Sequence, residues 1–524
     1  MTPRRILAIV ALCIIIGIVP AVPAVPAVAQ QADALLNRKI DCADRPQGRD
    51  YDDAEAGVIC GVLQVPENWD EPDGRQIEIG FAVLETTSDN PSLEPLIYLQ
   101  GGPGGELASS PLFFDSIFAQ HRRDRDLIIF DQRGAGLSSP LACEDYVDGY
   151  ADTNQNGFGS YRTVRECADG LRADGVDLTQ YNSVNNAHDV MALMQSLAAG
   201  RGYARYHVYG LSYGTRLALV MLRQYPDDPL IASVTLDSPF PTQIRQFEQI
   251  PAIFQEVLTN VFTTCATDAE CDTAYPNLKA RYLALLDGAN DPLRRSFNSA
   301  NALDELVLVN GLRAGIDVSP LFAAYIPRLI QAFEDGDSDL FYTVLYTVLD
   351  EAALEAQDLI VVDTISSEMY WSLQCREEIA FESEDGVRAA IDALEHPLLG
   401  AYSLYNYESL YDVCRGWDNG SAEDDFKLPV SSNLPILILQ GDFDMRTPPS
   451  WGRAAAETLP NATYLRVPAT GHGTINENAC ISDITSAYMN DPSLAIDSSC
   501  LGGLALKFIM PDDVIENDYS MGDF

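Results

Sequence analysis

The chain has 524 residues, with 77 acidic against 33 basic side chains, and its formal net charge is −44. A surface this acidic repels polyanions, which argues against nucleic acid or an anionic bilayer as a partner. Hydrophobic residues make up 47% of the chain and charged residues only 21%, so a large core can form and extensive disorder is not expected. The length permits one large enzyme domain with a substantial insertion, or two to three independent domains.

Residues 1–29 are predicted to be a secretory signal peptide. Arg4 and Arg5 precede an apolar run at 6–19, and a Pro/Ala-rich stretch ends in the small-x-small sequence Ala-Val-Ala at 27–29. We expect cleavage after Ala29 and a secreted protein, periplasmic or extracellular. The alternative is a retained membrane anchor, but the apolar run is shorter than the roughly 20 residues that a membrane span needs. Stable membrane insertion after cleavage is therefore not expected.

The number of cysteines is consistent with secretion. Loss of Cys13 with the signal peptide leaves ten of the 11 cysteines, an even number in a chain bound for an oxidising compartment. Pairing sequence neighbours closes the shortest loops and costs the least chain entropy. The predicted disulfides are Cys42–Cys60, Cys143–Cys167, Cys265–Cys271, Cys375–Cys414 and Cys480–Cys500. A metal site is not expected, because no C-x-x-C occurs and the five histidines are never at ligand spacing.

The first half of the mature chain has the pattern of an α/β protein. Short apolar runs that end at Gly or Asp are typical of strands, and apolar residues at helical spacing indicate helices. Strands are predicted at 76–87, 95–100, 127–131, 206–211 and 232–236, and helices at 187–197 and 213–223. Strands that alternate with helices predict a mostly parallel sheet with flanking helices.

The middle of the chain differs, and the α/β pattern returns after it. Helices are predicted at 250–262, 321–333 and 341–356, with few strand signals between them; strands follow at 435–440 and 463–467, around a helix at 451–459. A mainly helical insertion in a sheet domain usually lies over the strand ends, where ligands bind. We therefore expect a core at 30–240 and 433–524, with a large helical cap at 241–432.

A candidate nucleophile lies between a predicted strand and a predicted helix. Residues 210–214 read Gly-Leu-Ser-Tyr-Gly, a G-x-S-x-G sequence. A strand that turns sharply into a helix strains the serine backbone, admits only small flanking residues and exposes the hydroxyl of Ser212. The backbone N–H of Tyr213 then opens the helix and points at a developing oxyanion.

A glycine-rich loop follows the strand predicted at 95–100. Residues 100–105 read Gln-Gly-Gly-Pro-Gly-Gly, which lets the backbone approach a substrate closely. A tetrahedral intermediate needs two preorganised donors, and the N–H of Gly102 is the candidate for the second. The alternative is a plain tight turn.

A serine nucleophile needs a histidine to take its proton and a carboxylate to orient that histidine. In α/β proteins whose nucleophile lies on a G-x-S-x-G turn, the acid and then the histidine follow the serine in the sequence, each in a loop after a strand. His472, between two glycines, follows the strand at 463–467, and both Asp442 and Asp444 follow the strand at 435–440. Spacing alone does not choose between the two aspartates.

Taken together, these motifs resemble those of a known family, the α/β-hydrolase peptidases related to prolyl aminopeptidase. Within that family the sequence resembles the secreted bacterial tripeptidyl-aminopeptidase-like branch. The resemblance covers nearly the whole mature chain. It is carried by Cys60-Gly61 with Val65-Pro66, by the motifs at 100–104, 131–138, 210–214, 441–444 and 471–473, by Thr447-Pro448, and by the C-terminal segment between Cys480 and Cys500.

The resemblance implies an α/β-hydrolase fold and a serine aminopeptidase that uses no cofactor. It assigns the nucleophile to Ser212, the base to His472 and the orienting acid to Asp444, and it supports Gly102 and Tyr213 as oxyanion donors. Gln100 stands where prolyl aminopeptidases proper have histidine, so strict proline specificity is not expected. The alternatives are a secreted carboxylesterase or lipase with the same triad, and a non-catalytic binding protein that kept the fold.

Aminopeptidases of this kind hold the free α-ammonium of a peptide with acidic groups from the cap. Glu377 and Glu378, beside Cys375, are the candidates for this role. The alternative is that both are solvated, like most acids in so acidic a chain. Tyr370 and Trp371 either line an apolar pocket or pack in the core.

Overall fold

The computed structural model describes residues 57–108, 111–143, 160–287, 305–337, 339–345, 365–476 and 479–513. The predicted signal peptide and Cys42 lie outside these ranges. Within them, no helix is both long enough and apolar enough to cross a membrane.

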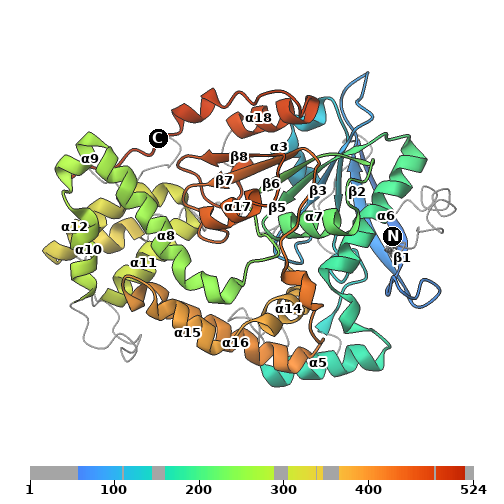
Figure 1. The fold of residues 1–524 in the computed structure, drawn as a ribbon, viewed down its shortest axis with the longest axis horizontal. Helices are drawn as coiled ribbons and strands as arrows, with labels where there is room; N and C mark the ends of the chain where they lie inside the picture. The colour runs from blue at the N-terminus through green and yellow to red at the C-terminus, as the bar shows by residue number, and fades with distance from the viewer. Residues whose placement is uncertain are drawn as a thin grey trace, which may run out of the picture.

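An eight-stranded sheet runs through the middle of the molecule (Figure 1), with the order β1-β2-β4-β3-β5-β6-β7-β8. Its strands are β1 Val58–Pro66, β2 Gln76–Leu84, β3 Leu96–Leu99, β4 Leu127–Phe130, β5 Tyr206–Leu211, β6 Ile231–Asp237, β7 Ile436–Gly441 and β8 Ala462–Val467. β2 pairs antiparallel with β1 and β4, and every other pairing is parallel. This is the α/β-hydrolase fold expected from the sequence. Among the strands, β1 is the one that was not predicted.

Helices cover both faces of the sheet. They are α3 Pro111–Phe118, α6 Ser183–Arg201, α7 Tyr213–Gln224, α17 Pro449–Ala456 and α18 Ala479–Asn490. Successive residues of β7 serve the two faces in turn, as a strand's period of two requires. Ile436 and Ile438 pack in a core with α6, α7 and α17, while Leu437 and Leu439 pack with α3 and α18.

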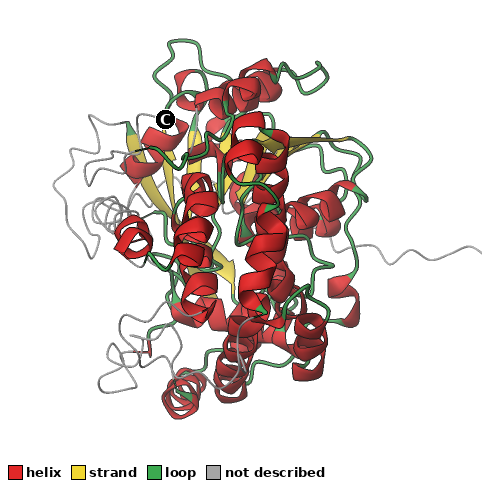
Figure 2. Cartoon of the chain, turned by 90° about the vertical axis from the view of Figure 1, so that its left-hand side faces the viewer, coloured by secondary structure: helices red, strands yellow, loops and turns green. Residues whose placement is uncertain are grey.

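Between β6 and β7 the described chain contains helices and no strand of the sheet. They are α8 Gln246–Thr267, α9 Ala269–Ala274, α10 Leu278–Leu286, α11 Glu305–Val318, α12 Ile326–Asp335, α14 Ser367–Glu377, α15 Glu384–Asp392 and α16 Ala401–Trp417. In Figure 1, α8 to α12 gather at one end of the sheet and α14 to α16 run along its lower edge. Figure 2, seen from the side of α8 to α12, shows helices in front of the strands. These helices form the cap.

One helix from outside the expected cap segment also packs on it. α5, Tyr161–Ala173, precedes β5 in the chain but lies against α16. The guanidinium of Arg172 donates a hydrogen bond of 2.9 Å to the backbone carbonyl of Asp418, just after α16. The cap therefore packs against a helix from the first part of the chain as well as consisting of residues from its middle part.

Disulfides staple the core and the cap. Cys143–Cys167, Cys265–Cys271, Cys375–Cys414 and Cys480–Cys500 are bonded, which are four of the five neighbour pairs expected. Cys60 is also in a disulfide. The third bridge links the C-terminal end of α14 to α16 and so fixes two cap helices to each other.

Candidate active site

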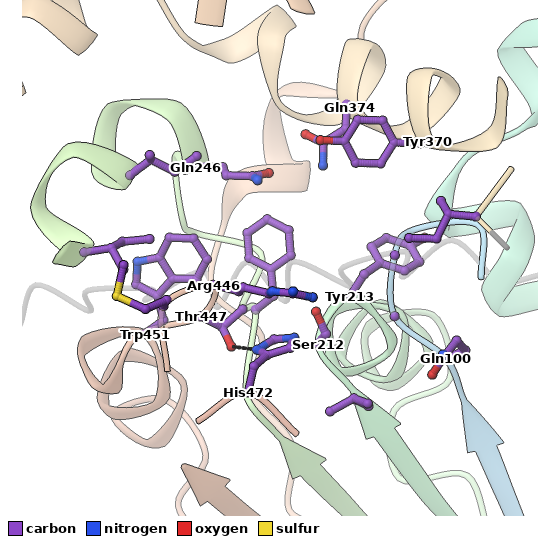
Figure 3. Close-up of a pocket in the computed structure, with 18 of the residues that line it drawn as sticks. Gln100, Ser212, Tyr213, Gln246, Tyr370, Gln374, Arg446, Thr447, Trp451 and His472 are labelled. Carbon is purple, nitrogen blue, oxygen red and sulfur yellow. Dashed lines mark hydrogen bonds between the residues drawn. The ribbon is translucent and has the colours of Figure 1, made fainter. Parts of the chain in front are cut away.

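Ser212 occupies the sharp turn between β5 and α7, with φ 56° and ψ −123°. Non-glycine residues rarely adopt a positive φ, so the surrounding structure must hold this strained conformation. The flanking glycines explain how the turn fits. A Cβ at Gly214 would overlap the carbonyl oxygen of Leu99, and a Cβ at Gly210 would overlap that of Gly214. The serine side chain thus stands clear and lines a cavity (Figure 3).

His472 lines the same cavity and is held from behind by Asp444. Its Nδ1 lies 2.9 and 3.0 Å from the two carboxylate oxygens of Asp444. The hydroxyl of Thr447 donates to the same carboxylate at 2.8 Å and lies 3.3 Å from Nδ1. Figure 3 shows the imidazole and the Ser212 hydroxyl on the same floor of the cavity. No hydrogen bond joins Ser212 and His472 among the described residues, and catalytic hydrogen bonds of this kind often tighten only in the complex with substrate.

The structure decides between the two candidate aspartates. Asp444 is fully buried; burial opposes its ionisation, but the imidazole of His472 and the backbone N–H groups of Thr447 and Arg446 keep its pKa below the ordinary value. It is therefore an anion beside His472. Asp442 instead forms an ion pair of 2.6 Å with Arg466, away from the imidazole.

The loop that carries His472 is anchored by a residue that the sequence analysis did not single out. Asp237, at the end of β6, accepts hydrogen bonds from the backbone N–H groups of Thr474 and Ile475, at 3.0 and 3.1 Å. Next to it, the hydroxyl of Ser238 accepts the N–H of Gly473 at 2.9 Å. The sequence held one signal that could have identified Asp237: it is an acidic residue at the C-terminal end of a predicted strand. Asp442 and Asp444 were singled out because they follow β7 in a similar way.

The two residues expected to donate to an oxyanion both lie at the cavity. Gly102 and Tyr213 both line the cavity, and neither N–H has an acceptor in the described part of the chain. The glycine loop lies directly over the nucleophile, since a Cβ at Gly101 would lie 2.8 Å from the Cβ of Ser212. Gln132 clamps the loop by donating to the carbonyl of Gln100 at 3.0 Å.

The cavity has a volume of about 560 Å³ and lies between the ends of the parallel strands and the cap. Its walls are rich in aromatic side chains: Phe113, Phe114, Phe240, Phe247, Phe254 and Trp451. The cap adds the polar side chains of Tyr370, Gln246 and Gln374, which point into the cavity in Figure 3. Arg313 and Arg446 also line it, and none of its described lining residues is a carboxylate.

This finding corrects the expected role of Glu377 and Glu378, which are 2% and 1% exposed and do not line the cavity. Glu377 accepts hydrogen bonds from the backbone N–H and the hydroxyl of Ser183, each at 2.6 Å. Glu378 pairs with Arg216 on α7 and, at 2.6 Å, with Lys427. Both carboxylates therefore tie α14 to the core instead of facing a substrate amine.

The two aromatic candidates of the cap, Tyr370 and Trp371, lie in different surroundings. Tyr370 lines the cavity, where burial, followed by the charge of Glu378, raises its pKa to about 12. Trp371 is fully buried and packs edge-on against Trp417 at 5.5 Å between ring centroids. Neighbouring residues of α14 thus serve the site and the core.

Comparison with known proteins finds relatives that are named as peptidases and hydrolases. A family model described as "TAP-like protein" matches residues 400–500. The serine protease Hip1 of Mycobacterium tuberculosis is 24% identical over 464 residues, which cover 83% of this chain and 85% of that protein. Tripeptidyl aminopeptidase of Streptomyces coelicolor is 28% identical over 199 residues, covering 34% and 36% of the two chains. The putative hydrolase YuaR of Escherichia coli is 21% identical over 85% and 88%. With its strand order and these relatives, the chain is a serine hydrolase of the α/β-hydrolase fold, and its residues 400–500 are similar to the TAP-like proteins.

Proposed function

We propose that the protein is a secreted serine exopeptidase of the aminopeptidase type, which hydrolyses peptide bonds near a free N-terminus. The observation that carries the proposal is the contact between His472 and buried Asp444, beside the strained Ser212 in one cavity. Peptide chemistry is supported by the similarity, over 83% of this chain, to a protein named a serine protease and by the shorter match to a tripeptidyl aminopeptidase.

In the first step the Oγ of Ser212 attacks the carbonyl carbon of the scissile bond while Nε2 of His472 takes its proton. Asp444 stabilises the resulting imidazolium through Nδ1, at the 2.9 Å contact already present. The negative charge that develops on the carbonyl oxygen is met by the N–H groups of Gly102 and Tyr213. The imidazolium then protonates the leaving amine, the C–N bond breaks, and an acyl-enzyme remains.

Water completes the cycle. His472 takes a proton from a water molecule whose oxygen attacks the acyl carbon, and the same two N–H groups hold the second oxyanion. Collapse of this intermediate returns the proton to the Oγ of Ser212 and releases the acid. Every proton moves through His472, so the steps balance without a cofactor.

Recognition of the free amine is assigned to neutral groups of the cap. Gln246 and Gln374 line the cavity, and the side-chain oxygen of each is buried without a hydrogen-bond donor among the described residues. An unsatisfied buried acceptor is costly, so a substrate N–H that reaches it gains more than an ordinary hydrogen bond. We propose that these carboxamides replace Glu377 and Glu378 as the contacts of the α-ammonium group.

The second candidate is a carboxylesterase. Its support is specific: the cavity walls are rich in aromatic and aliphatic side chains, and their described residues include no carboxylate to neutralise an amine. The same triad cleaves esters, and the leaving alcohol needs no cationic subsite.

The test uses purified mature protein with a Ser212→Ala control. A fluorophosphonate should label the wild type and not the control. The substrates are aminoacyl and tripeptidyl amides, each with a free or an acetylated N-terminus, and short acyl esters. We expect cleavage of the free-amine amides that drops at least about tenfold on acetylation, in line with the loss of a charged hydrogen bond. Ester turnover without amide turnover would replace the peptidase by the esterase.

Secretion is also part of the proposal. Its support is the signal-like sequence at 1–29 and the disulfides of the described chain, which persist in oxidising compartments. Expression of the full chain in a bacterial host, followed by N-terminal sequencing of the exported protein, should find Gln30 as the first residue. An uncleaved, membrane-bound product would indicate the retained anchor.

A further inference from the structure

We infer that Arg313 determines specificity by binding a carboxylate group of the substrate inside the catalytic cavity. The inference rests on the proposed function in taking the substrate to be a peptide. It adds an anionic recognition element that neither the family match nor the triad supplies.

The guanidinium of Arg313 is held in position but forms no ion pair with the described residues. Arg313 extends from α11 and lines the cavity of Ser212 and His472, with its Cζ 4.3 Å from the ring centroid of Tyr402 on α16. Stacking on Tyr402 fixes the plane of the guanidinium. Its Nε is buried and has no acceptor, and no described carboxylate forms an ion pair with it. Arg313 as a whole is half-buried, but a polar atom such as its Nε is costly to bury without an acceptor, and we infer that the acceptor arrives with the substrate.

The composition of the chain strengthens this argument. With 77 acidic residues available, nearby carboxylates are abundant, and several other arginines of the cap region have taken one. The ion pairs are Arg281–Glu334, Arg388–Glu384 and Arg415–Asp412. Arg313 faces instead a cavity whose described lining contains a second arginine and no carboxylate. Arg446 is paired with Asp317, whereas Arg313 has no counter-ion among the described residues, so the positive charge of Arg313 favours an anionic substrate group there.

The position of α11 indicates which part of the substrate carries this group. Its C-terminal residues, Ile316–Val318, line a smaller cavity of about 180 Å³ together with His472. In the same region Arg446 pairs with Asp317 at 3.2 Å. α11 therefore lies on the His472 side of the site. Because His472 protonates the leaving amine, we place the carboxylate on the departing portion of the peptide.

A carboxylate can reach Arg313 from two sources: the free C-terminus of a short peptide, or an acidic side chain on the leaving portion. Both offer the planar pair of oxygens that a guanidinium binds through two parallel hydrogen bonds. The test separates them with one parent peptide in three forms. One form has a C-terminal carboxylate, one has a C-terminal amide, and the third has a C-terminal amide with glutamate in place of glutamine in the leaving portion.

We expect the wild type to cleave at least one carboxylate-bearing form with a kcat/KM about tenfold or more above that of the fully neutral amide, the range for a charge-assisted hydrogen bond. Arg313→Gln should abolish this preference. Arg313→Lys should retain part of it, because lysine keeps the positive charge but cannot form the two parallel hydrogen bonds of a guanidinium. The matched control is Arg415→Gln, since Arg415 also stacks on a tyrosine, at 5.1 Å from the Tyr161 ring, but does not line the cavity. It should keep the full preference.

Equal rates for all three peptides in the wild type, or a preference that survives Arg313→Gln, would overturn the inference. Fluorophosphonate labelling of each variant shows that the nucleophile is intact; if Arg313→Gln is not labelled, the comparison rests on Arg313→Lys. If the labelled wild type cleaves no peptide at all, the proposed function has failed and not this inference. The same comparison is then made with esters whose leaving alcohol bears a carboxylate or its amide, with the same two outcomes.

Discussion

Asp237 accepts both the backbone N–H and the hydroxyl of Thr474, each at 3.0 Å and each on the same carboxylate oxygen. Thr474 lies two residues after His472, so this contact sets the position of the loop that presents the imidazole. The other oxygen of Asp237 accepts the hydroxyl of Tyr209 at 2.8 Å and the N–H of Ile475. With the hydroxyl of Ser238, which donates to the first oxygen at 3.5 Å, five donors converge on one fully buried carboxylate.

We predict that Asp237→Asn lowers kcat by about 10- to 100-fold, because the amide turns an N–H₂ toward two donors and shifts the His472 loop. The KM should change little, since Asp237 does not line the cavity. Steady-state kinetics and the rate of fluorophosphonate labelling measure the effect. Thermal unfolding of the same samples must show a folded protein at the assay temperature. An unchanged kcat would show that the loop holds its position without this carboxylate.

A second prediction separates Asp444 from Asp442. Asp444→Asn should lower kcat by about 10³- to 10⁴-fold, because an amide cannot stabilise the imidazolium and favours the wrong tautomer of His472. The matched variant Asp442→Asn removes only the partly exposed ion pair with Arg466 and should change kcat by less than about threefold. A large loss in both variants would mean that the loop, and not the single carboxylate, is required.

These aspartates show where sequence reasoning stops. The G-x-S-x-G turn could be located because its requirement is local: the positive φ of Ser212 and the tight approaches at Gly210 and Gly214 restrict each position to small residues. The choice between Asp442 and Asp444 is not local. Both follow the same strand, and only the path of the loop beyond it turns one carboxylate toward His472 and the other toward Arg466.

The error at Glu377 and Glu378 has a related cause. Their position beside a disulfide in the cap was visible in the sequence, but their partners were not. Arg216 and Lys427 are 162 and 49 residues away from Glu378 in the chain. Whether an acidic residue faces a substrate or closes a buried ion pair depends on such tertiary contacts. The packing of α5 on the cap escaped prediction for the same reason.

A third prediction concerns the disulfide Cys375–Cys414. It joins α14, which carries Tyr370 and Gln374 into the cavity, to α16. Replacing both cysteines with serine should cost about 4 kcal/mol of unfolding free energy, because the bridge closes a long loop. KM should rise as the cap helices separate. The matched control is the Cys265–Cys271 pair, whose loop spans 6 residues against 39 and whose loss should cost about 2 kcal/mol. Denaturant unfolding measures both; equal losses would contradict the loop-length argument.

The last prediction uses a buried carboxyl group at the base of the cap. Glu382 accepts the backbone N–H of Glu248 at 2.7 Å with one oxygen, while its other oxygen is buried and unpaired within the described chain. Burial, followed by the charge of Glu378, raises the pKa of Glu382 from 4.5 to about 8. Between these two values the folded protein binds a proton that the unfolded chain has released. The contribution of Glu382 to stability is therefore full below pH 4.5 and is lost as the pH rises toward 8.

Glu382→Gln is neutral at every pH and should lack this loss. Its Tm relative to the wild type should accordingly increase between pH 5 and pH 8, by about 1 to 3 °C. Measurements stay below pH 8 because burial lowers the pKa of nearby Lys427 to about 8, and its titration acts with the opposite sign above that value. Glu384→Gln, which removes only an exposed ion pair with Arg388, is the matched control and should follow the wild type. A constant difference in Tm across the range would show that Glu382 is already ionised in the folded protein at pH 5.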